Sequence, residues 1–378
     1  MRLVTVIDAK TWYPTDNLYG TLISLIHGIN LNIGRHIITR VTNALTRVKS
    51  EKKYVDSGGY SIIVGDVHPR DFRLFIQYYV HFLDTADPNL YDYLFSLDIP
   101  VLLKYPNTKI TQLYEYNKLS LSETFNVLNV KPDLKKKLIF IWQFKVENVY
   151  EMWSQLVDDF SVYEHFDKFG VGGMVGIRRL TGISFTPFIG PFFRILYDCR
   201  RYNVQPKLIH FLGISNYTDR IVGSILQHIL NKVLNYDTII SYDTFAVITR
   251  GMIKQRMPRE ILEMYDKGRR WTREELAEVV RANIDYWVKE DKEISRTTES
   301  LTEVITDVTK PIEFRVRECI LRLSPLKLSN NHIKELETSL KMLTFAWNKY
   351  CETDDLQVFN EKVMKPFIRL IGLPNLPN

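Results

Sequence analysis

Three aspartates stand where apolar, strand-like stretches of the sequence end. Asp56 follows Tyr54 and Val55, Asp98 ends the stretch 93–98, and Asp243 ends the stretch 238–243. Two carboxylates that share one pocket can divide the work of a nucleophile and a general acid/base. That division is the arrangement used in retaining glycosyl transfer through a covalent intermediate.

An amide and two glycine steps occupy similar positions in the chain. Gln143 ends the apolar stretch 138–143, and the steps Gly172-Gly173 and Gly213 end two further stretches. Guanine offers N1–H and N2–H donors and an O6 acceptor, so a carboxylate beside an amide and bare backbone N–H groups can read that edge. Spacing alone does not separate a glycosyl transferase from other barrel enzymes.

Strand-like and helical stretches alternate through the region that carries these residues. At least six strands are readable, at 54–56, 93–98, 138–143, 168–174, 207–213 and 238–243. Repeated βα units predict a parallel sheet with its ligand at the carboxyl ends of the strands. No GxGxxG or GxxxxGK[ST] loop follows any strand, which disfavours a nucleotide-binding doubly wound sheet. We therefore predict a TIM (β/α)8 barrel, with a closed eight-stranded barrel inferred rather than counted.

The two ends of the chain differ from this alternating region. Residues 1–53 form a lead-in, with a strand at 3–7 and a helical pattern across Gly20 to Val48. We predict a barrel core over 1–250. The helical, charged segment 251–378 is expected to complete the barrel and to form a C-terminal subdomain.

Composition limits the classes of protein to consider. The 378 residues are 45% hydrophobic and carry a net charge of +6, which permits a polyanionic partner without requiring one. Cys199, Cys319 and Cys351 lie far apart with no CxxC pair, which argues against a disulfide framework or a cysteine-rich zinc site. No signal-peptide core or apolar run of ~20 residues is present, so we expect a cytoplasmic protein (host cytoplasm if phage-encoded) without membrane contact.

Taken in order, these segments resemble the guanine transglycosylase family, which exchanges guanine in nucleic acid for a 7-deazaguanine on a TIM barrel. The resemblance covers about residues 54–250. Its most specific parts are the Asp-Ser-Gly-Gly turn and the Gly-Gly-x-x-Gly step. The matching segments are Asp56-Ser57-Gly58-Gly59-Tyr60, Leu97-Asp98, Ile141-Trp142-Gln143, Val171-Gly172-Gly173-Met174-Val175-Gly176, His210-Phe211-Leu212-Gly213 and Tyr242-Asp243-Thr244.

The resemblance implies a role for each matching residue. Asp243 would be the nucleophile that attacks C1′ and holds the sugar covalently, and Asp56 would be the general acid/base. Asp237 is the rival nucleophile, and Asp243 is preferred because an apolar strand leads into it. The residues implied in binding the base are Asp98, Gln143, Gly172, Gly173, Met174, Ser57, Tyr60 (stacking on the base) and Gly213.

The sequence also departs from the family pattern. The Cys-x-Cys-x-x-Cys zinc motif that follows the nucleophile in the tRNA enzymes is missing, and His332 stands alone in that region. Ser61 replaces a glutamine, and Ile177 replaces an acid found in bacterial members. No zinc or other cofactor is therefore expected. These departures fit the phage and bacterial DNA-guanine transglycosylases, which insert 7-deazaguanine derivatives such as 7-cyano-7-deazaguanine into DNA.

The expected partners are DNA, with tRNA as the alternative, and a 7-deazaguanine base. A homodimer or accessory proteins are further expected partners. Acids are interleaved among the basic residues near 250–273, so a solvated charged helix face is the other reading of that segment. The residues predicted to contact phosphates are Arg178, Arg179, Arg250, Lys254, Arg256, Arg269 and Arg270.

Three other functions remain open from the sequence. The chain could be a tRNA-guanine transglycosylase that lacks the zinc site, or a hydrolase that releases the free base. It could also be a non-catalytic barrel that binds nucleic acid or a partner subunit. The presence of both Asp56 and Asp243 disfavours the last of these, because a binding module needs no nucleophile.

Overall fold

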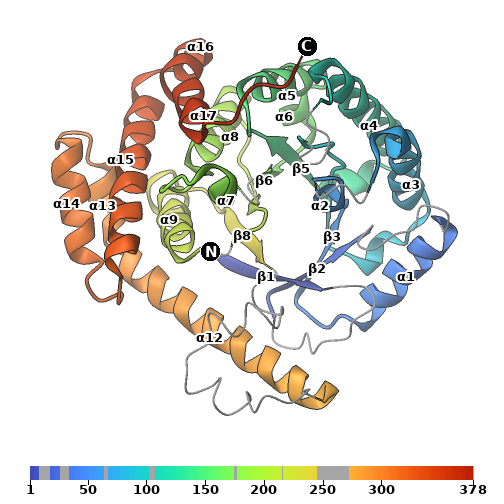
Figure 1. Ribbon diagram of the computed structural model, residues 1–378, viewed down its shortest axis with the longest axis horizontal. Coiled ribbons are helices and arrows are strands. Elements are labelled where there is room, and N and C mark those ends of the chain that lie inside the picture. The colour runs from blue at the N-terminus through green and yellow to red at the C-terminus, as the bar shows by residue number, and fades with distance from the viewer. Residues whose placement is uncertain are drawn as a thin grey trace.

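Eight parallel strands close into a barrel in the computed structural model, which describes residues 1–7, 18–25, 34–63, 67–101, 107–173, 177–214, 216–244 and 272–377 (Figure 1). Each strand pairs with the next, and β8 pairs with β1 to close the ring. The predicted TIM barrel with C-terminal helices is thereby confirmed. The strands are β1 Arg2–Ile7, β2 Gly20–Ser24, β3 Lys52–Asp56, β4 Tyr93–Phe95, β5 Leu138–Gln143, β6 Lys168–Gly172, β7 Leu208–Phe211 and β8 Ile239–Thr244.

The helical pattern predicted across Gly20 to Val48 is wrong in its first part. Gly20–Ser24 is strand β2, and only Gly34–Arg47 forms a helix, α1. The backbone of Gly20 lies so close to its neighbours that a Cβ there would stand 2.9 Å from the ring of Tyr54 and from a methyl of Val4. Pairing with β1 and β3 on both sides thus outweighs the local spacing of apolar residues.

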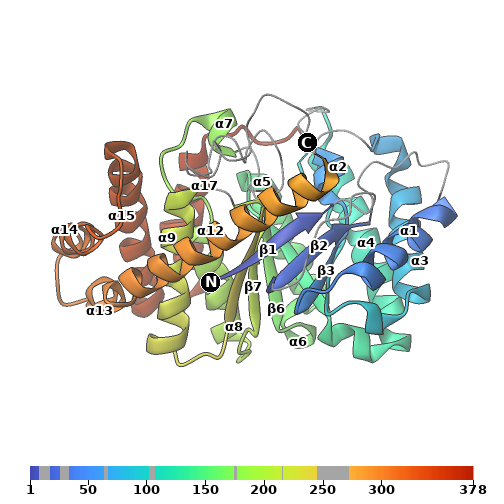
Figure 2. The same ribbon diagram turned by 90° about the horizontal axis from the view of Figure 1, so that it is seen from below.

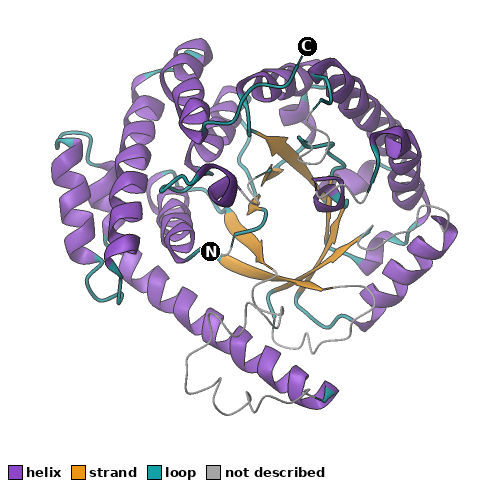
Figure 3. Cartoon of the chain, in the orientation of Figure 1, coloured by secondary structure: helices purple, strands orange, loops and turns teal. Residues whose placement is uncertain are grey.

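Helices surround the barrel on its outer side (Figures 1 and 3). Two short helices, α2 and α7, lie instead at the end to which the strand arrows point (Figure 2). The helices of the barrel region are α1, α2 Gly59–Ile63, α3 Phe72–Thr85, α4 Ile110–Val130, α5 Glu147–Asp159, α6 Val162–His165, α7 Ile177–Thr181, α8 Ile189–Arg201 and α9 Tyr217–His228. Short 3-10 turns at Pro69–Asp71, Pro88–Leu90 and Pro132–Lys136 and a π turn, Ile229–Val233, complete this region.

Further helices follow the last strand and flank α8 and α9 (Figure 1). Their bounds are α12 Arg273–Glu299, α13 Leu301–Thr306, α14 Ile312–Arg322, α15 Asn330–Glu352, α16 Leu356–Phe359 and α17 Lys365–Ile371, with a π turn, η6, at Asn360–Met364. All eight strands precede residue 245, and the domain division at 250 stays a prediction. None of the helices in the described ranges is long and apolar enough to cross a membrane.

Alternation along the strands sorts side chains into two cores. One cluster fills the barrel interior and the other fills the space between strands and helices. The interior cluster is Val4, Val6, Leu22, Tyr54, Phe95, Ile139, Ile141 and Leu208. In β8, Tyr242 packs outward, where its hydroxyl donates to Asp291 at 2.7 Å, while Ser241 and Asp243 hydrogen-bond to His210 of β7. The interior therefore turns polar toward the carboxyl ends of the strands.

A buried arginine ties the C-terminal region to the barrel. Arg194 of α8 is 1% exposed, and its Nε donates to Asp198 Oδ2 at 2.8 Å. Its guanidinium also donates to the hydroxyls of Tyr150 and Ser154 in α5 and to Asn360 Oδ1, at the start of η6. One planar cation thus holds three segments together, a geometry that guanidinium favours.

We predict that Arg194→Met lowers the free energy of unfolding by roughly 3–5 kcal/mol, because it leaves the Asp198 carboxylate buried without its partner. Urea unfolding followed by circular dichroism measures the loss. The double variant Arg194→Met/Asp198→Leu removes both charges and is expected to recover most of it. Wild-type stability in the single variant would contradict this account.

Candidate active site

Several site residues that the sequence predicts lie in the described ranges, and these come together at one end of the barrel. Asp56 and Gln143 are the last residues of β3 and β5, and Asp243 is the last but one of β8. Asp98 and Gly213 lie in the loops that follow β4 and β7. Because all eight strands are parallel, these positions share the carboxyl end of the barrel, where TIM-barrel enzymes hold their active sites.

The Asp-Ser-Gly-Gly turn brings backbone against a second carboxylate. The carbonyl of the half-buried Asp56 accepts the N–H of Leu25 at 2.8 Å. Gly58 has φ +100°, a conformation that glycine adopts without strain. A Cβ on Gly59 would lie 3.3 Å from Asp98 Oδ1. The turn therefore packs closely on Asp98, with Ser57 buried beside it at 1% exposure.

The loop that carries Asp98 is clamped by two polar residues of α4. Asn117 Oδ1 accepts the N–H of Ile99 at 2.7 Å, and Asn117 Nδ2 donates to the carbonyl of Ile99 at 3.0 Å. Ser120 Oγ donates to the carbonyl of Leu97 at 2.9 Å. Sequence reasoning missed both residues. Their signal was a pair of polar residues at i, i+3 spacing on the buried face of a helix.

Burial sets the ionisation of Asp98. The residue is 5% exposed, and burial raises the pKa of its carboxyl to about 7, with the negative charge of Asp56 acting in the same direction. Gln143 Nε2 donates to Asp98 Oδ2, which opposes the shift. This carboxyl therefore changes charge near neutral pH.

The glycine step of β6 leaves room for the Gln143 amide. A Cβ on Gly172 would stand 2.4 Å from Gln143 Nε2, and one on Gly173 would stand 2.3 Å from Gln143 Oε1. Gly173 also has φ +74°, which disfavours any side chain. The described residues offer no hydrogen-bond donor to the buried Oε1. The pair Gly172-Gly173 thus makes room for an amide whose acceptor has no donor among the described residues.

Asp243 is held by two donors on the same oxygen. The N–H of Gly213 donates to Asp243 Oδ1 at 2.8 Å, and His210 Nε2 lies 3.1 Å from that oxygen. A carboxylate oxygen only accepts, so His210 Nε2 is the donor to Asp243, and His210 Nδ1 lies 2.8 Å from the Ser241 hydroxyl oxygen. No hydrogen bond to Oδ2 forms within the described part of the chain. Within the described residues, Asp243 therefore has one oxygen held by two donors and the other without a partner.

This arrangement refines two sequence predictions. Gly213, predicted to bind the base, uses its N–H to hold Asp243 and has φ +75°. Asp237, the rival nucleophile, is exposed and precedes the first residue of β8, so it lies at the opposite end of the barrel from Asp243. His210 was missed as a site residue, although its place one residue before the end of β7 could have indicated an inward polar side chain.

Other predicted residues cannot be placed in this way. The side chains of Tyr60, Arg178 and Arg179 are outside the described part of the structure, although their backbones belong to α2 and α7. The stacking and phosphate-binding roles stay predictions. The residues that lie wholly outside the described ranges are Met174, Arg250, Lys254, Arg256, Arg269 and Arg270.

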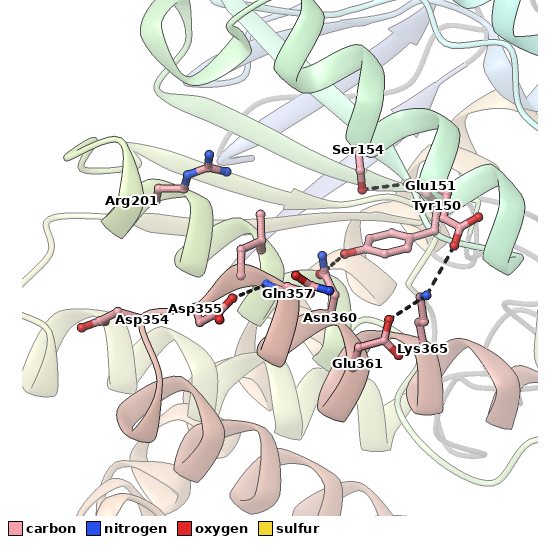
Figure 4. Close-up of a pocket in the computed structure, with 11 residues that line it drawn as sticks. Tyr150, Glu151, Ser154, Arg201, Asp354, Asp355, Gln357, Asn360, Glu361 and Lys365 are labelled. Carbon is pink, nitrogen blue, oxygen red and sulfur yellow. Dashed lines mark hydrogen bonds and ion pairs between the residues drawn. The ribbon is translucent and has the colours of Figure 1, made fainter.

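A separate surface hollow lies among α5, α16 and η6 (Figure 4). Its polar groups are engaged with one another: the Tyr150 hydroxyl donates to Asn360, and Lys365 pairs with Glu361 at 2.8 Å and Glu151 at 3.6 Å. None of its lining residues belongs to a strand end. It is therefore not part of the candidate active site.

Metal ligands and relatives give no further assignment. Among the described residues, no three His, Cys, Asp or Glu side chains are grouped to hold a metal ion, and the expectation that no zinc is needed stays an expectation. His332 lies in the first turn of α15, where its N–H donates to the capping Ser329 Oγ at 3.2 Å. Comparison with protein-family models finds no match, and comparison with curated proteins finds none either.

We predict that Asp98→Asn becomes more stable relative to wild type as pH rises from about 4 to about 7. In this window the unfolded carboxyl, with its ordinary pKa of 3.8, is ionised, while the folded one keeps its proton up to about 7. The stability that Asp98 contributes to the wild-type protein is therefore fully present below the unfolded pKa of 3.8 and is lost as the pH rises through the folded pKa of about 7. Melting temperatures of both proteins over this range, with the exposed Asp237→Asn as control, measure the difference. A difference that is constant with pH would contradict the raised pKa.

We predict that Asn117→Ala lowers the free energy of unfolding by roughly 1–3 kcal/mol, because it leaves the N–H and carbonyl of Ile99 buried without partners. Urea denaturation measures the change. Asn89→Ala, at an exposed position of the Pro88–Leu90 turn, is the matched control and should stay close to wild type. Equal stabilities of the two variants would show that Asn117 does not clamp the loop.

Proposed function

We propose that this chain is a DNA-guanine transglycosylase, a pentosyltransferase that exchanges guanine in DNA for a 7-deazaguanine such as 7-cyano-7-deazaguanine. The observation that carries the proposal is Asp243, whose Oδ1 is held by Gly213 and His210 while Oδ2 has no partner among the described residues. The same barrel end holds Asp98 and Gln143, a carboxyl–amide pair suited to a purine edge.

The geometry supports a two-step exchange with retention at the sugar. In the first step Asp243 Oδ2 forms a bond to C1′, the bond from C1′ to guanine breaks, and Asp56 protonates the departing base. In the second step Asp56 takes a proton from the incoming base. The nitrogen of that base then bonds to C1′ as the aspartyl ester breaks, which returns Asp243 to a carboxylate and leaves Asp56 protonated, as it was before the first step.

The support around Asp243 gives it a defined orientation for attack. His210 and Gly213 both donate to Oδ1, so the rotation that would exchange the two carboxylate oxygens costs two hydrogen bonds. The Ser241 hydroxyl, 2.8 Å from His210 Nδ1, in turn holds the imidazole ring in place. Such a supported carboxylate favours an enzyme over the alternative of a non-catalytic binding barrel.

Recognition of the base would fall to Asp98 and Gln143. The ionised Asp98 can accept the N1–H and N2–H of guanine, and Gln143 orients it through the bond from Nε2 to Oδ2. The missing side chains of Gly59 and Gly172 let the Asp98 carboxyl and the Gln143 amide pack against the backbone. Taking guanine out of a duplex costs a few kcal/mol, which contacts in this pocket must offset.

One sequence feature favours DNA over tRNA as the polymer. The zinc motif of the tRNA enzymes is missing from the sequence, and the net charge of +6 suits a polyanion of either kind. A tRNA enzyme without zinc is the second candidate, and a hydrolase that releases guanine is distinguished by whether a new base enters.

We predict that labelled guanine enters duplex DNA in the presence of the purified protein and does not enter bulk tRNA. Asp243→Asn should lower the exchange rate ~10³-fold or more, because an amide cannot act as the nucleophile. Asp237→Asn, at the other end of β8, is the matched control and should exchange at the wild-type rate. Label in tRNA alone would move the protein to the tRNA enzymes. Full activity of Asp243→Asn would overturn the assignment of Asp243 as the nucleophile.

A further inference from the structure

A lysine that the exchange mechanism does not use lies buried beside the base pocket. Lys145 follows β5 by two residues and is 1% exposed. Its Nζ is buried and has no hydrogen-bond partner among the described residues. Burial alone lowers the pKa of Lys145 to about 8, so the ammonium is still the main form at neutral pH.

An unpartnered buried ammonium is costly, and proteins seldom keep one without a ligand to meet it. A second buried polar atom without a partner among the described residues belongs to Gln143, two residues earlier in the chain, and is its acceptor Oε1. The side chains of Gln143 and Lys145 both adjoin Gly173: a Cβ there would lie 2.3 Å from Gln143 Oε1 and 3.9 Å from Lys145 Cβ. Two side chains that adjoin the same glycine, one a donor and one an acceptor, thus have no partner among the described residues.

We infer that Lys145 is a specificity-determining residue of the base pocket, which donates to an acceptor on the incoming base and excludes bases that carry a cationic substituent. This inference rests on the proposed function. Gln143 Oε1 takes a donor of the same ligand, so the two residues together recognise one N–H and one acceptor of the base.

The charge of Lys145 makes the selection sharper than a hydrogen bond alone. An ammonium in a dry pocket is attracted to a carbonyl or nitrile and repels a second ammonium, and both effects grow where water is excluded. A 7-cyano-7-deazaguanine satisfies the donor, whereas a 7-aminomethyl-7-deazaguanine brings a like charge. Exclusion of this kind is selection by repulsion as well as attraction.

Direct binding of free bases tests the inference without catalysis. Equilibrium dialysis of wild type, Lys145→Met and Lys145→Gln is run with guanine, 7-cyano-7-deazaguanine and 7-aminomethyl-7-deazaguanine. Methionine keeps the length of the side chain and removes an unpartnered charge, so Lys145→Met is expected to fold, and its melting curve checks this. Lys136→Met, at an exposed position before β5, is the matched control.

Wild type and Lys136→Met should bind the cyano base roughly tenfold or more tighter than the aminomethyl base. In Lys145→Met the ratio should fall close to one. Lys145→Gln keeps a donor without the charge, so it should hold the cyano base better than Lys145→Met does and admit the aminomethyl base.

Two outcomes overturn the inference, and they are distinguishable. If the bases bind and the cyano-to-aminomethyl ratio is the same in wild type and Lys145→Met, Lys145 does not select the base, while the proposed exchange stands. If no base binds wild type at all, the base pocket itself is wrong, and the proposed function fails together with this inference.

Discussion

The hydrogen bond between His210 and Asp243 joins two neighbouring strands inside the barrel, and the candidate chemistry depends on it. A closed parallel barrel leaves no strand edge, so an inward side chain near a strand's carboxyl end can meet only its neighbours or a ligand. At β7 and β8 those neighbours are His210, Ser241 and Asp243. The bond from His210 engages one carboxylate oxygen of Asp243, and the other oxygen has no partner within the described part of the chain. The constraint that shapes the fold therefore also orients the proposed nucleophile.

On the opposite side of the same barrel end, burial and not pairing decides the ionisation of the polar side chains. Asp98 is enclosed by the Asp56 turn, by Gln143 and by a loop that α4 clamps through Asn117. Burial raises the pKa of Asp98 to about 7. It acts in the opposite direction on a cation and lowers the pKa of Lys145 to about 8. Between these values both groups are mainly charged, which is the state a polar base edge requires.

The sequence predicted the barrel and the strand-end residues because alternation of strands and helices is a local signal that survives in one chain. It misassigned Gly20–Ser24, where pairing with β1 and β3 decides the conformation. His210 and Asn117 were missed for a related reason: their roles depend on partners 33 and 18 residues away in the chain. Contacts between separate elements cannot be read from spacing, and only the fold brings them together.

The most direct test of the account is whether Asp243 becomes covalently joined to DNA. A labelled duplex oligonucleotide is incubated with the protein, the reaction is quenched by denaturation during turnover, and the cross-linked peptide is identified by mass spectrometry. The account predicts a deoxyribosyl adduct on the peptide that contains Asp243 and none in Asp243→Asn. An adduct on another residue, or exchange without any adduct, would contradict the central claim that Asp243 is the nucleophile.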